Sequence, residues 1–397
     1  MIPRLKPFMG IDDLFAAISF FKSKSVEKFE SEFAKKVNQK YAIAFPYGRT
    51  ALMILLEAMN LKKKEIICPA YTCIVVPHAI VFSENDPVFL DSNPNDFNMD
   101  LKKIEPLLNN DTGAIVATSI FGYPINLDEL KRIKKKYPNI KIIQDCAHSF
   151  TANYHGEFVH TVGDAAIFAM NISKHMNSIF GGMVTTDDAD LAKKLIHLRD
   201  SKLKSPPFKK TLFRLAYLFA VYPTFHPFLY GIVNWMERKK LLGKLVEKFD
   251  SKIFMPDDYL DKMIDVEARV GISQLKKIDR IIQDRVDAVN YYFDSLKDIK
   301  EIQLPPKIEG ATYSHFTIQV ENRDKLISYM LDKAIQLGQL IEYSVPELDS
   351  YKNRNYRVRP ECNVASNFVP KVVNLPISSG MKDVQKVVSE LRKYYGI

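Results

Sequence analysis

Seven short runs of apolar and β-branched residues, separated by longer helical stretches, limit how this chain can fold more than any other feature. They occupy residues 42–45, 65–70, 87–91, 114–120, 141–145, 165–170 and 182–186. Short runs joined by helical segments are typical of a parallel sheet whose two faces are both covered by helices. The pattern therefore predicts an α/β fold with a mostly parallel seven-stranded sheet.

The remainder of the 397-residue chain has a different pattern. We expect a large domain over residues 1–257 and a smaller C-terminal α+β domain over residues 258–397. Residues 258–300 have the periodicity of one long amphipathic helix that leads out of the large domain. A strand at 312–320 and a closing helix from residue 381 are expected within the smaller domain.

The net charge of +9 would suit a nucleic acid, an anionic membrane surface or a phosphorylated substrate. The lysines are spread through amphipathic segments such as residues 131–136, and no recognised nucleic-acid motif accompanies them. We interpret the excess charge as a solvated basic face and expect no nucleic-acid partner.

The four cysteines show neither CxxC nor zinc-ligand spacing. We expect them to be reduced thiols, and we expect no metal site. The N-terminal residues lack the basic segment, apolar run and small-residue cleavage site of an export signal. A cytoplasmic location is the corresponding expectation.

Residues 211–249 are unusually apolar for a chain of this composition. Leu215 to Met236 carries no formal charge, but Pro223 and Pro227 interrupt it. Because a spanning helix needs roughly 20 continuous apolar residues, we do not expect a transmembrane span. Two interpretations remain open: residues 211–245 form short amphipathic helices on a membrane surface, or they pack onto a partner subunit or roof a site.

Lys174 follows the run at 165–170, and Gly181 and Gly182 lie a few residues downstream. A lysine that forms a Schiff base needs a strand-end position and partial desolvation, so that its amine can lose a proton. The two glycines permit close backbone approach. A simply solvated lysine is the alternative.

Asp145 ends the run at 141–145, so its carboxylate emerges where ligands of such sheets bind. It can cap a helix, or it can pair with the protonated ring nitrogen of a pyridine cofactor. His148 follows three residues later and can support that contact or cap the turn.

Residues 47–52 place a glycine, Gly48, at the start of a helix. The free amides and positive dipole of a helix start suit a phosphate group. Tyr71 follows the run at 65–70, and it can stack on an aromatic ring or belong to the core.

These features occur together with further motifs in a fixed order. The motifs lie at residues 27–34, 47–52, 67–72, 87–91, 121–124, 145–149, 163–168, 173–174, 181–182, 262–275 and 372–377. In this set the chain resembles the nucleotide-sugar aminotransferases of the DegT/StrS group. The resemblance runs from about residue 25 to the end and is interrupted near residues 205–250.

The resemblance implies the aspartate-aminotransferase type of fold, a homodimer and the cofactor pyridoxal 5'-phosphate (PLP). It implies that Lys174 attaches the cofactor and moves the proton, that Asp145 holds the pyridine nitrogen, and that His148 lies beside the ring. Tyr71 would stack on the ring. The phosphate would be bound by the turn that contains Gly48, Arg49 and Thr50.

Three departures from the family pattern concern the site. Ala169 replaces the usual phosphate-binding serine, so Asn171 or Ser173 is expected to substitute. Ile179-Phe180 replaces Gly-Glu, and the residues at 260–263 replace the motif whose asparagine reaches the neighbouring subunit's phosphate. The substrate pocket is therefore expected to differ from the common form.

The function implied is transfer of an amino group, with glutamate as the expected donor, to a keto-sugar used in surface polysaccharide or glycolipid synthesis. The presence of Lys174 argues against the dehydratase subgroup, which has histidine at that position. Two alternatives stay open: a catalytically silent PLP-binding regulator or scaffold, and an aminotransferase for a membrane-associated non-sugar carbonyl.

Overall fold

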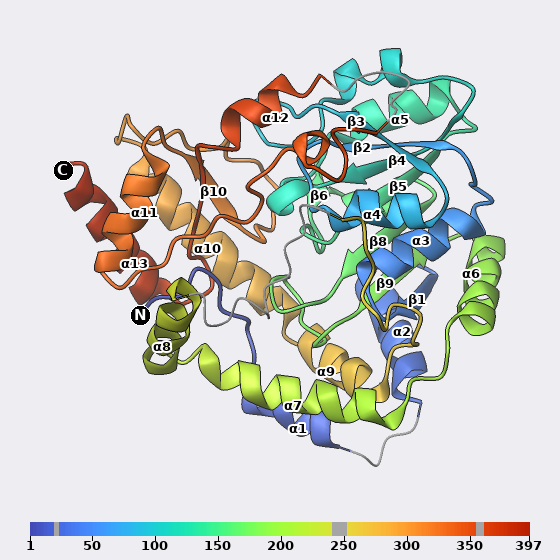
Figure 1. The fold of residues 1–397 in the computed structure, drawn as a ribbon, viewed down its shortest axis with the longest axis horizontal. Helices are drawn as coiled ribbons and strands as arrows, with labels where there is room; N and C mark the ends of the chain where they lie inside the picture. The colour runs from blue at the N-terminus through green and yellow to red at the C-terminus, as the bar shows by residue number, and fades with distance from the viewer. Residues whose placement is uncertain (20–23, 240–251, 355–360) are drawn as a thin grey trace.

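A computed structural model of the chain describes residues 1–19, 24–239, 252–354 and 361–397. Seven strands form one sheet in the order β1-β9-β8-β5-β4-β2-β3 (Figure 1). They are β1 (Tyr41–Phe45), β2 (Glu65–Pro69), β3 (Asp86–Leu90), β4 (Thr112–Thr118), β5 (Lys141–Asp145), β8 (Ala165–Ala169) and β9 (Gly182–Thr186). The strands from β8 to β3 are parallel, and β9 is antiparallel to both its neighbours. The predicted mostly parallel seven-stranded sheet is confirmed.

Helices cover both faces of this sheet, because successive side chains of a strand point to opposite sides. In β1, Ile43 and Phe45 join the core beneath α3 (Gly48–Ala58), α4 (Val75–Phe82) and α6 (Ala189–Lys202). Ala42 and Ala44 join the core beneath α2 (Ser25–Lys36) and α5 (Leu127–Lys136). A short hairpin, β6 (Asn153–Tyr154) and β7 (Glu157–Phe158), lies outside the sheet.

The C-terminal part contains a two-stranded antiparallel sheet and several helices (Figure 1). Its elements are α10 (Ile278–Leu296), β10 (Phe316–Gln319), α11 (Arg323–Asp332), α12 (Asn363–Phe368), β11 (Val372–Leu375) and α13 (Met381–Tyr394). Tyr292 of α10 stacks on Phe316 of β10 with ring centroids 5.5 Å apart. The expected closing helix from residue 381 is present, and the expected strand at 312–320 is confined to the residues of β10.

The expectation of a single long helix over residues 258–300 is wrong. The segment forms two helices, α9 (Asp265–Leu275) and α10, which meet at Lys276 and Lys277. α9 packs closely against α2, where a Cβ at Gly271 would lie 2.5 Å from the Phe29 ring, whereas α10 packs in the C-terminal part. Because the two halves pack against different parts of the protein, the chain changes direction between them. The periodicity of the sequence alone does not show this change.

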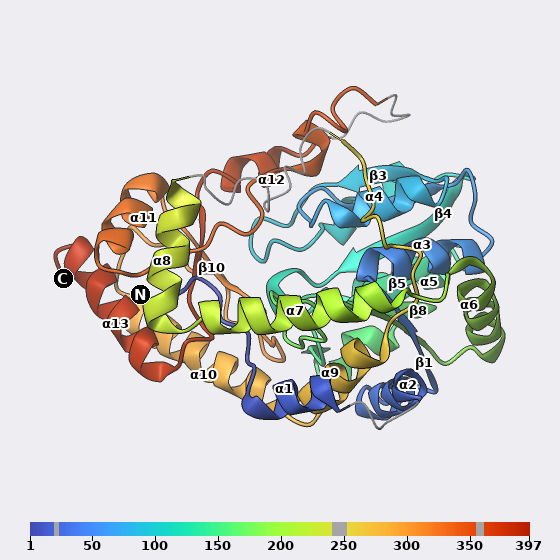
Figure 2. The same cartoon turned by 60° about the horizontal axis from the view of Figure 1, so that its bottom comes forward.

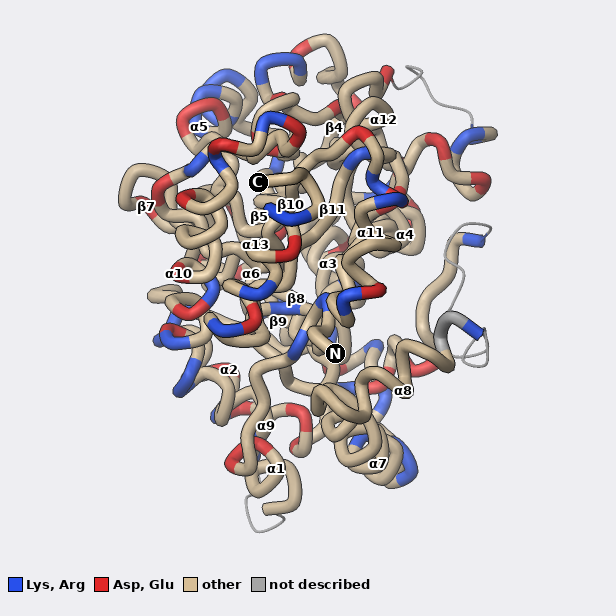
Figure 3. The backbone as a smooth tube through the Cα atoms, turned by 90° about the vertical axis from the view of Figure 1, so that its left-hand side faces the viewer, with Lys and Arg blue, Asp and Glu red and all other residues tan. Residues whose placement is uncertain are grey.

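Three further helices lie along one side of the molecule. α7 (Phe208–Thr224) runs beside α1 (Ile11–Ile18) and α9, and α8 (Pro227–Arg238) turns toward the C-terminal part (Figures 1 and 2). There Tyr230 of α8 donates a hydrogen bond to Gln336, and the N-terminal amine donates to Pro227 O at 3.0 Å. Figure 3 shows that the chain from the middle of α7 into α8 carries no charged residue.

Helices are therefore present in the segment 211–245 as far as the structure describes it, and residues 240–245 lie outside the described residues. Within the described ranges, none of the helices combines the length and the apolar content needed to cross a bilayer.

Candidate active site

A cavity of about 230 Å³ lies at the carboxyl ends of the central strands. Thr118 ends β4, Asp145 ends β5 and Ala169 ends β8, and all of them line it. Gly48 lines the cavity from the start of α3, and the loop at 340–343 closes it from the C-terminal part. This is where a sheet of this kind binds ligands.

Asp145 presents a buried carboxylate to this cavity. The residue is 3 % exposed, and its oxygens accept hydrogen bonds from Thr118 Oγ1 at 3.2 Å and from Ala147 N at 3.0 Å. Burial raises the pKa of Asp145, and the Ala147 amide and the charge of Lys174 oppose that rise. The carboxylate is therefore held in place by two neutral donors, and a cation in the cavity would favour its ionised form.

Lys174 lies in the loop between β8 and β9 and also lines the cavity. Its amide donates to Asn171 O at 3.0 Å, and its carbonyl accepts from Arg285 Nη2 at 3.4 Å. Desolvation by the surrounding protein lowers the pKa of Lys174, while Cys73 and Asp145 act to raise it. A lowered pKa increases the neutral fraction of the amine, which is the nucleophilic form.

His148 is 4 % exposed and lines the same cavity as Asp145. Its Nδ1 accepts a hydrogen bond from Phe121 N at 3.2 Å, so the ring hydrogen of the neutral form is on Nε2. Burial lowers the pKa of His148 well below its usual range, and the charges of Lys174, His315 and His175 add to this. His148 is therefore a neutral donor.

The turn at the start of α3 contributes Gly48 and Arg49 to the lining. A Cβ at Gly48 would lie 2.8 Å from the Cβ of Ala169, so glycine is needed where α3 meets β8. The hydrogen bonds of α3 begin with Ala51 N, which donates to Tyr47 O at 2.9 Å, and the first-turn amides precede that bond. Thr50 is fully buried, and its hydroxyl donates to Tyr259 O at 3.0 Å instead of lining the cavity.

Asn171 and Ser173, the expected substitutes for the missing serine, both line the cavity. Ser173 Oγ donates to Asn171 Oδ1 at 2.7 Å, and Ser173 N donates to the same oxygen at 3.0 Å. The Asn171 amide nitrogen is thus turned away from Ser173, because the oxygen takes both bonds.

Tyr71 is not in the cavity wall. It is 1 % exposed, its hydroxyl donates to Ile341 O at 3.2 Å, and its ring lies among Phe97, Phe121 and Phe368 at centroid distances of 4.7 to 6.2 Å. The structure therefore places Tyr71 in the core, and the expectation that it stacks on a ring in the cavity is corrected. Cys73, two residues further on, lines the cavity and was not singled out from the sequence.

Leu340, Ile341 and Tyr343 line the cavity from the C-terminal part. No motif in the sequence predicts that they belong to the site. Tyr343 reaches back to α4, since its hydroxyl accepts a hydrogen bond from Ile74 N at 3.1 Å. These residues are distant in sequence from the strands and belong to no strand or helix that a periodic pattern would reveal.

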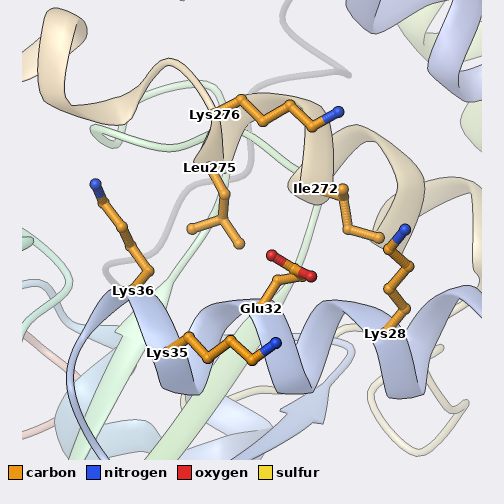
Figure 4. Close-up of a pocket in the computed structure, with 7 residues that line it drawn as sticks. All are labelled: Lys28, Glu32, Lys35, Lys36, Ile272, Leu275 and Lys276. Atoms are coloured by element: carbon orange, nitrogen blue, oxygen red, sulfur yellow. The ribbon is translucent and has the colours of Figure 1, made fainter.

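A second pocket lies between α2 and α9 and shares no residue with the first (Figure 4). Its volume is about 350 Å³, and it is lined by Lys28, Glu32, Lys35, Lys36, Ile272, Leu275 and Lys276. Four of these residues are lysines and one is a glutamate, and they lie on the surfaces of two helices. This arrangement is typical of a solvated basic face. None of the site residues predicted from the sequence lines this second pocket.

The chain matches the model of the DegT/DnrJ/EryC1/StrS aminotransferase family over residues 13–217 and 244–392. The unmatched stretch lies inside the interruption expected near residues 205–250 and contains the end of α7 and all of α8.

Similar proteins cover nearly the whole chain. GDP-perosamine synthase of Caulobacter vibrioides is 34% identical over an alignment of 380 residues that covers 92% of this chain and 89% of that protein. A dTDP-3-amino-3,6-dideoxy-alpha-D-galactopyranose transaminase of Aneurinibacillus thermoaerophilus is 27% identical, covering 93% of this chain and 90% of its own length. Among solved structures, an aminotransferase from Psychrobacter cryohalolentis has a TM-score of 0.79 at 19% identity over 100% of this chain and 99% of its own, which establishes the fold.

Proposed function

The chain belongs to the DegT/DnrJ/EryC1/StrS aminotransferase family and is a PLP-dependent aminotransferase, and from this we propose that it transfers an amino group from glutamate to a nucleotide-linked keto-sugar. The observation that carries the proposal is that Asp145, Lys174 and the α3 turn line one cavity. Relatives named as a perosamine synthase and an amino-sugar transaminase support the keto-sugar acceptor, and surface polysaccharide or glycolipid is the proposed destination of the product.

The residues of the cavity fit the cofactor. Asp145 offers a buried carboxylate with room for one more donor, which suits a protonated pyridine nitrogen. Gly48 makes a close approach that any Cβ would block, and the first-turn amides of α3 suit a phosphate. We assign the phosphate to the amides of residues 48–50, with Asn171 and Ser173 as added polar groups. The Thr50 hydroxyl is committed to Tyr259 O, so only its amide is proposed as a ligand.

When bound, PLP supplies a protonated ring that withdraws electrons from the amine-bearing carbon. We propose that Asp145 keeps that ring nitrogen protonated through its negative charge. Lys174 Nζ would be the group that holds the cofactor, and its free amine would move the proton on the substrate carbon. Its lowered pKa supports this role, because a neutral amine is needed at the moment of proton removal. His148, as a neutral donor, orients the ring from beside Asp145.

The test of this function is half-transamination of the PLP-loaded protein. Addition of glutamate should replace the absorbance of the pyridoxal form with that of the pyridoxamine form, and a nucleotide-linked keto-sugar should restore the first spectrum. A protein that holds PLP but shows neither change is a silent scaffold. Restoration only by a non-sugar carbonyl would reject the keto-sugar acceptor while keeping the aminotransferase.

We further propose that the enzyme is a homodimer with its active sites at the interface, as the family resemblance implies. Residues 260–263 lie beside the connection between α6 and α7, where Lys204 forms a parallel bridge with Asp261. Contact of this region with the partner subunit is part of the proposal.

We also propose peripheral membrane contact through an apolar face made by α1, α7 and α8. Its exposed residues are Ile11, Phe15, Ile18, Phe208, Leu212, Phe213, Phe219, Phe228, Leu229, Ile232 and Trp235. Residues 208–236 contain no Asp or Glu, and the lysines and arginines that follow from residue 238 give the charge that anionic lipids attract. An exposed patch of this composition marks an interaction site.

A further inference from the structure

Arg214 lies at the centre of a buried charged cluster beneath α7. The buried residues of this helix are Lys210, Arg214 and Leu218, spaced by four, while Leu212 and Phe213 are 61% and 59% exposed. A helix ordinarily turns its apolar stripe inward and its charges outward. Because buried charges are costly unless they are paired, the reversed pattern of α7 requires specific partners inside the protein.

Those partners are two carboxylates. Arg214 Nε donates to Glu267 Oε1 at 2.8 Å, and Arg214 Nη2 donates to Asp258 Oδ2 at 2.6 Å. Lys210 Nζ lies 3.4 Å from the same Asp258 oxygen. The Glu267 side chain is fully buried, and the Arg214 side chain is 4% exposed. Each of the two cations is thus paired with at least one of the two carboxylates.

The cluster also holds Tyr47, which is the last residue before α3. Arg214 Nη2 donates to the Tyr47 hydroxyl at 2.8 Å, and that hydroxyl donates to Asp258 Oδ1 at 2.5 Å. The Tyr47 backbone is confined as well, since a Cβ at Gly182 would lie 2.4 Å from its carbonyl oxygen. Tyr47 is therefore fixed at both ends, by β9 at the backbone and by Arg214 and Asp258 at the hydroxyl.

Tyr47 is the N-cap of α3, and its carbonyl accepts the first hydrogen bond of that helix. The position of its backbone consequently sets where the amides of residues 48–50 lie. Arg214 also covers the Phe180 ring, with the guanidinium carbon 4.3 Å from the ring centroid, and Tyr47 and Phe180 both line the cavity. Arg214 itself is separated from the cavity by these two aromatic side chains.

We propose that Arg214 is a positioning residue that fixes the phosphate-binding turn of the active site through Tyr47. The inference rests on the proposed function, because it takes the turn at residues 48–50 as the phosphate site. The inference goes beyond that function because it makes α7 a support of the active site. The opposite side of α7 contributes to the apolar face. The loss of Arg214 or of the Tyr47 hydroxyl should weaken recognition of a phosphate group more than recognition of the ring that carries it.

The experiment compares PLP with pyridoxal, which lacks the phosphate, as ligands of the apoprotein. Dissociation constants are measured by quenching of protein fluorescence for the wild type, Tyr47→Phe and Arg214→Met. Arg199→Met is the matched control, because Arg199 Nη1 pairs with Glu30 at 2.5 Å in a part of the large domain that does not line the cavity. Tyr47→Phe leaves every charge of the cluster in place, so it decides the question if Arg214→Met fails to fold.

We expect PLP to bind at least about tenfold more weakly to Tyr47→Phe and Arg214→Met, because a hydrogen bond to a charged group is lost in each. The dissociation constant of pyridoxal should stay within about twofold, and Arg199→Met should bind both ligands as the wild type does. Equal losses for PLP and pyridoxal, or no loss, in Tyr47→Phe would overturn the positioning role. A wild-type apoprotein that does not bind PLP would instead contradict the proposed function itself.

Discussion

Asp145 and Thr118 are joined across neighbouring parallel strands, where the Thr118 hydroxyl donates to Asp145 Oδ2 at 3.2 Å. The two residues end β5 and β4 and are direct partners in the strand register. Thr118 thus fixes one carboxylate oxygen, and Ala147 N fixes the other at 3.0 Å. The carboxylate is oriented before any ligand enters, which is the condition for holding a ring nitrogen in one place.

We expect Asp145→Asn to keep the cofactor and lose turnover. The amide cannot keep the ring nitrogen protonated, so the barrier should rise on the order of 4 kcal/mol, which is about a thousandfold in rate. Steady-state kinetics with glutamate and the acceptor measure the loss, and the cofactor absorbance measures retention. Thr118→Val is the graded control, because it keeps the charge and removes one hydrogen bond, at a cost of about tenfold. Near-normal turnover in Asp145→Asn contradicts the role of its charge.

The lowered pKa of Lys174 predicts unusual amine reactivity in the apoprotein. Desolvation disfavours the charged form, so the neutral amine should predominate at a lower pH than for a solvated lysine. The rate of arylation by trinitrobenzenesulfonate, mapped by mass spectrometry, should therefore rise with pH at an earlier midpoint for Lys174. The exposed Lys193 serves as the reference in the same digest.

Asp145 acts to raise the pKa of Lys174, so Asp145→Asn should move this midpoint to still lower pH. A midpoint for Lys174 equal to that of the reference lysine, or an upward shift in Asp145→Asn, would show that desolvation does not control this amine.

The apolar face predicts binding to anionic vesicles. The intact protein should float with vesicles that contain phosphatidylserine at low salt, where basic attraction is strongest. Replacing Leu212, Phe228 and Trp235 by serine should abolish flotation, because their exposure of 61%, 74% and 55% makes them the contact with the lipid. These residues lie outside the Arg214 cluster, so the active site should be unaffected.

A matched variant separates this effect from a general loss of apolar surface. Phe82, Phe158 and Ile196 are 38%, 38% and 42% exposed on other elements, and replacing them by serine should leave flotation intact. If the intact protein stays unbound at low salt, the membrane proposal is rejected, and a contact with the partner subunit becomes the account of the apolar face.

The proposed homodimer predicts a mass of twice 45.6 kDa in light scattering. The serine variant of the apolar face should remain dimeric if that face meets lipid, and should become monomeric if it meets the partner subunit. A wild-type protein that is monomeric in light scattering and fully active would contradict the proposed homodimer.

The strands of the sheet were predictable because each is a local run of β-branched and apolar residues with its own boundaries. Lys174 and Asp145 were found for a related reason: parallel strands bring their carboxyl ends to one edge, so a residue just after such a run has a predictable place. The structure puts both at the cavity.

What the sequence did not reveal depends on contacts between distant segments. Tyr71 and Cys73 are two residues apart, and packing against Phe368 buries the first while the second faces the cavity. Arg214 was not singled out, because a helix with inward cations has the same apolar composition as a surface helix. Its role depends on Glu267 and Asp258, which lie far along the chain.

The central claim is that Lys174 carries the cofactor, and borohydride reduction of the PLP-loaded protein tests it directly. Reduction fixes the pyridoxyl group on the amine that holds it, and peptide mass mapping then identifies that residue. We predict a single labelled peptide that contains Lys174, with no label when Lys174→Ala is treated in the same way. Label on any other lysine of the wild-type protein, with Lys174 unmodified, would contradict the account.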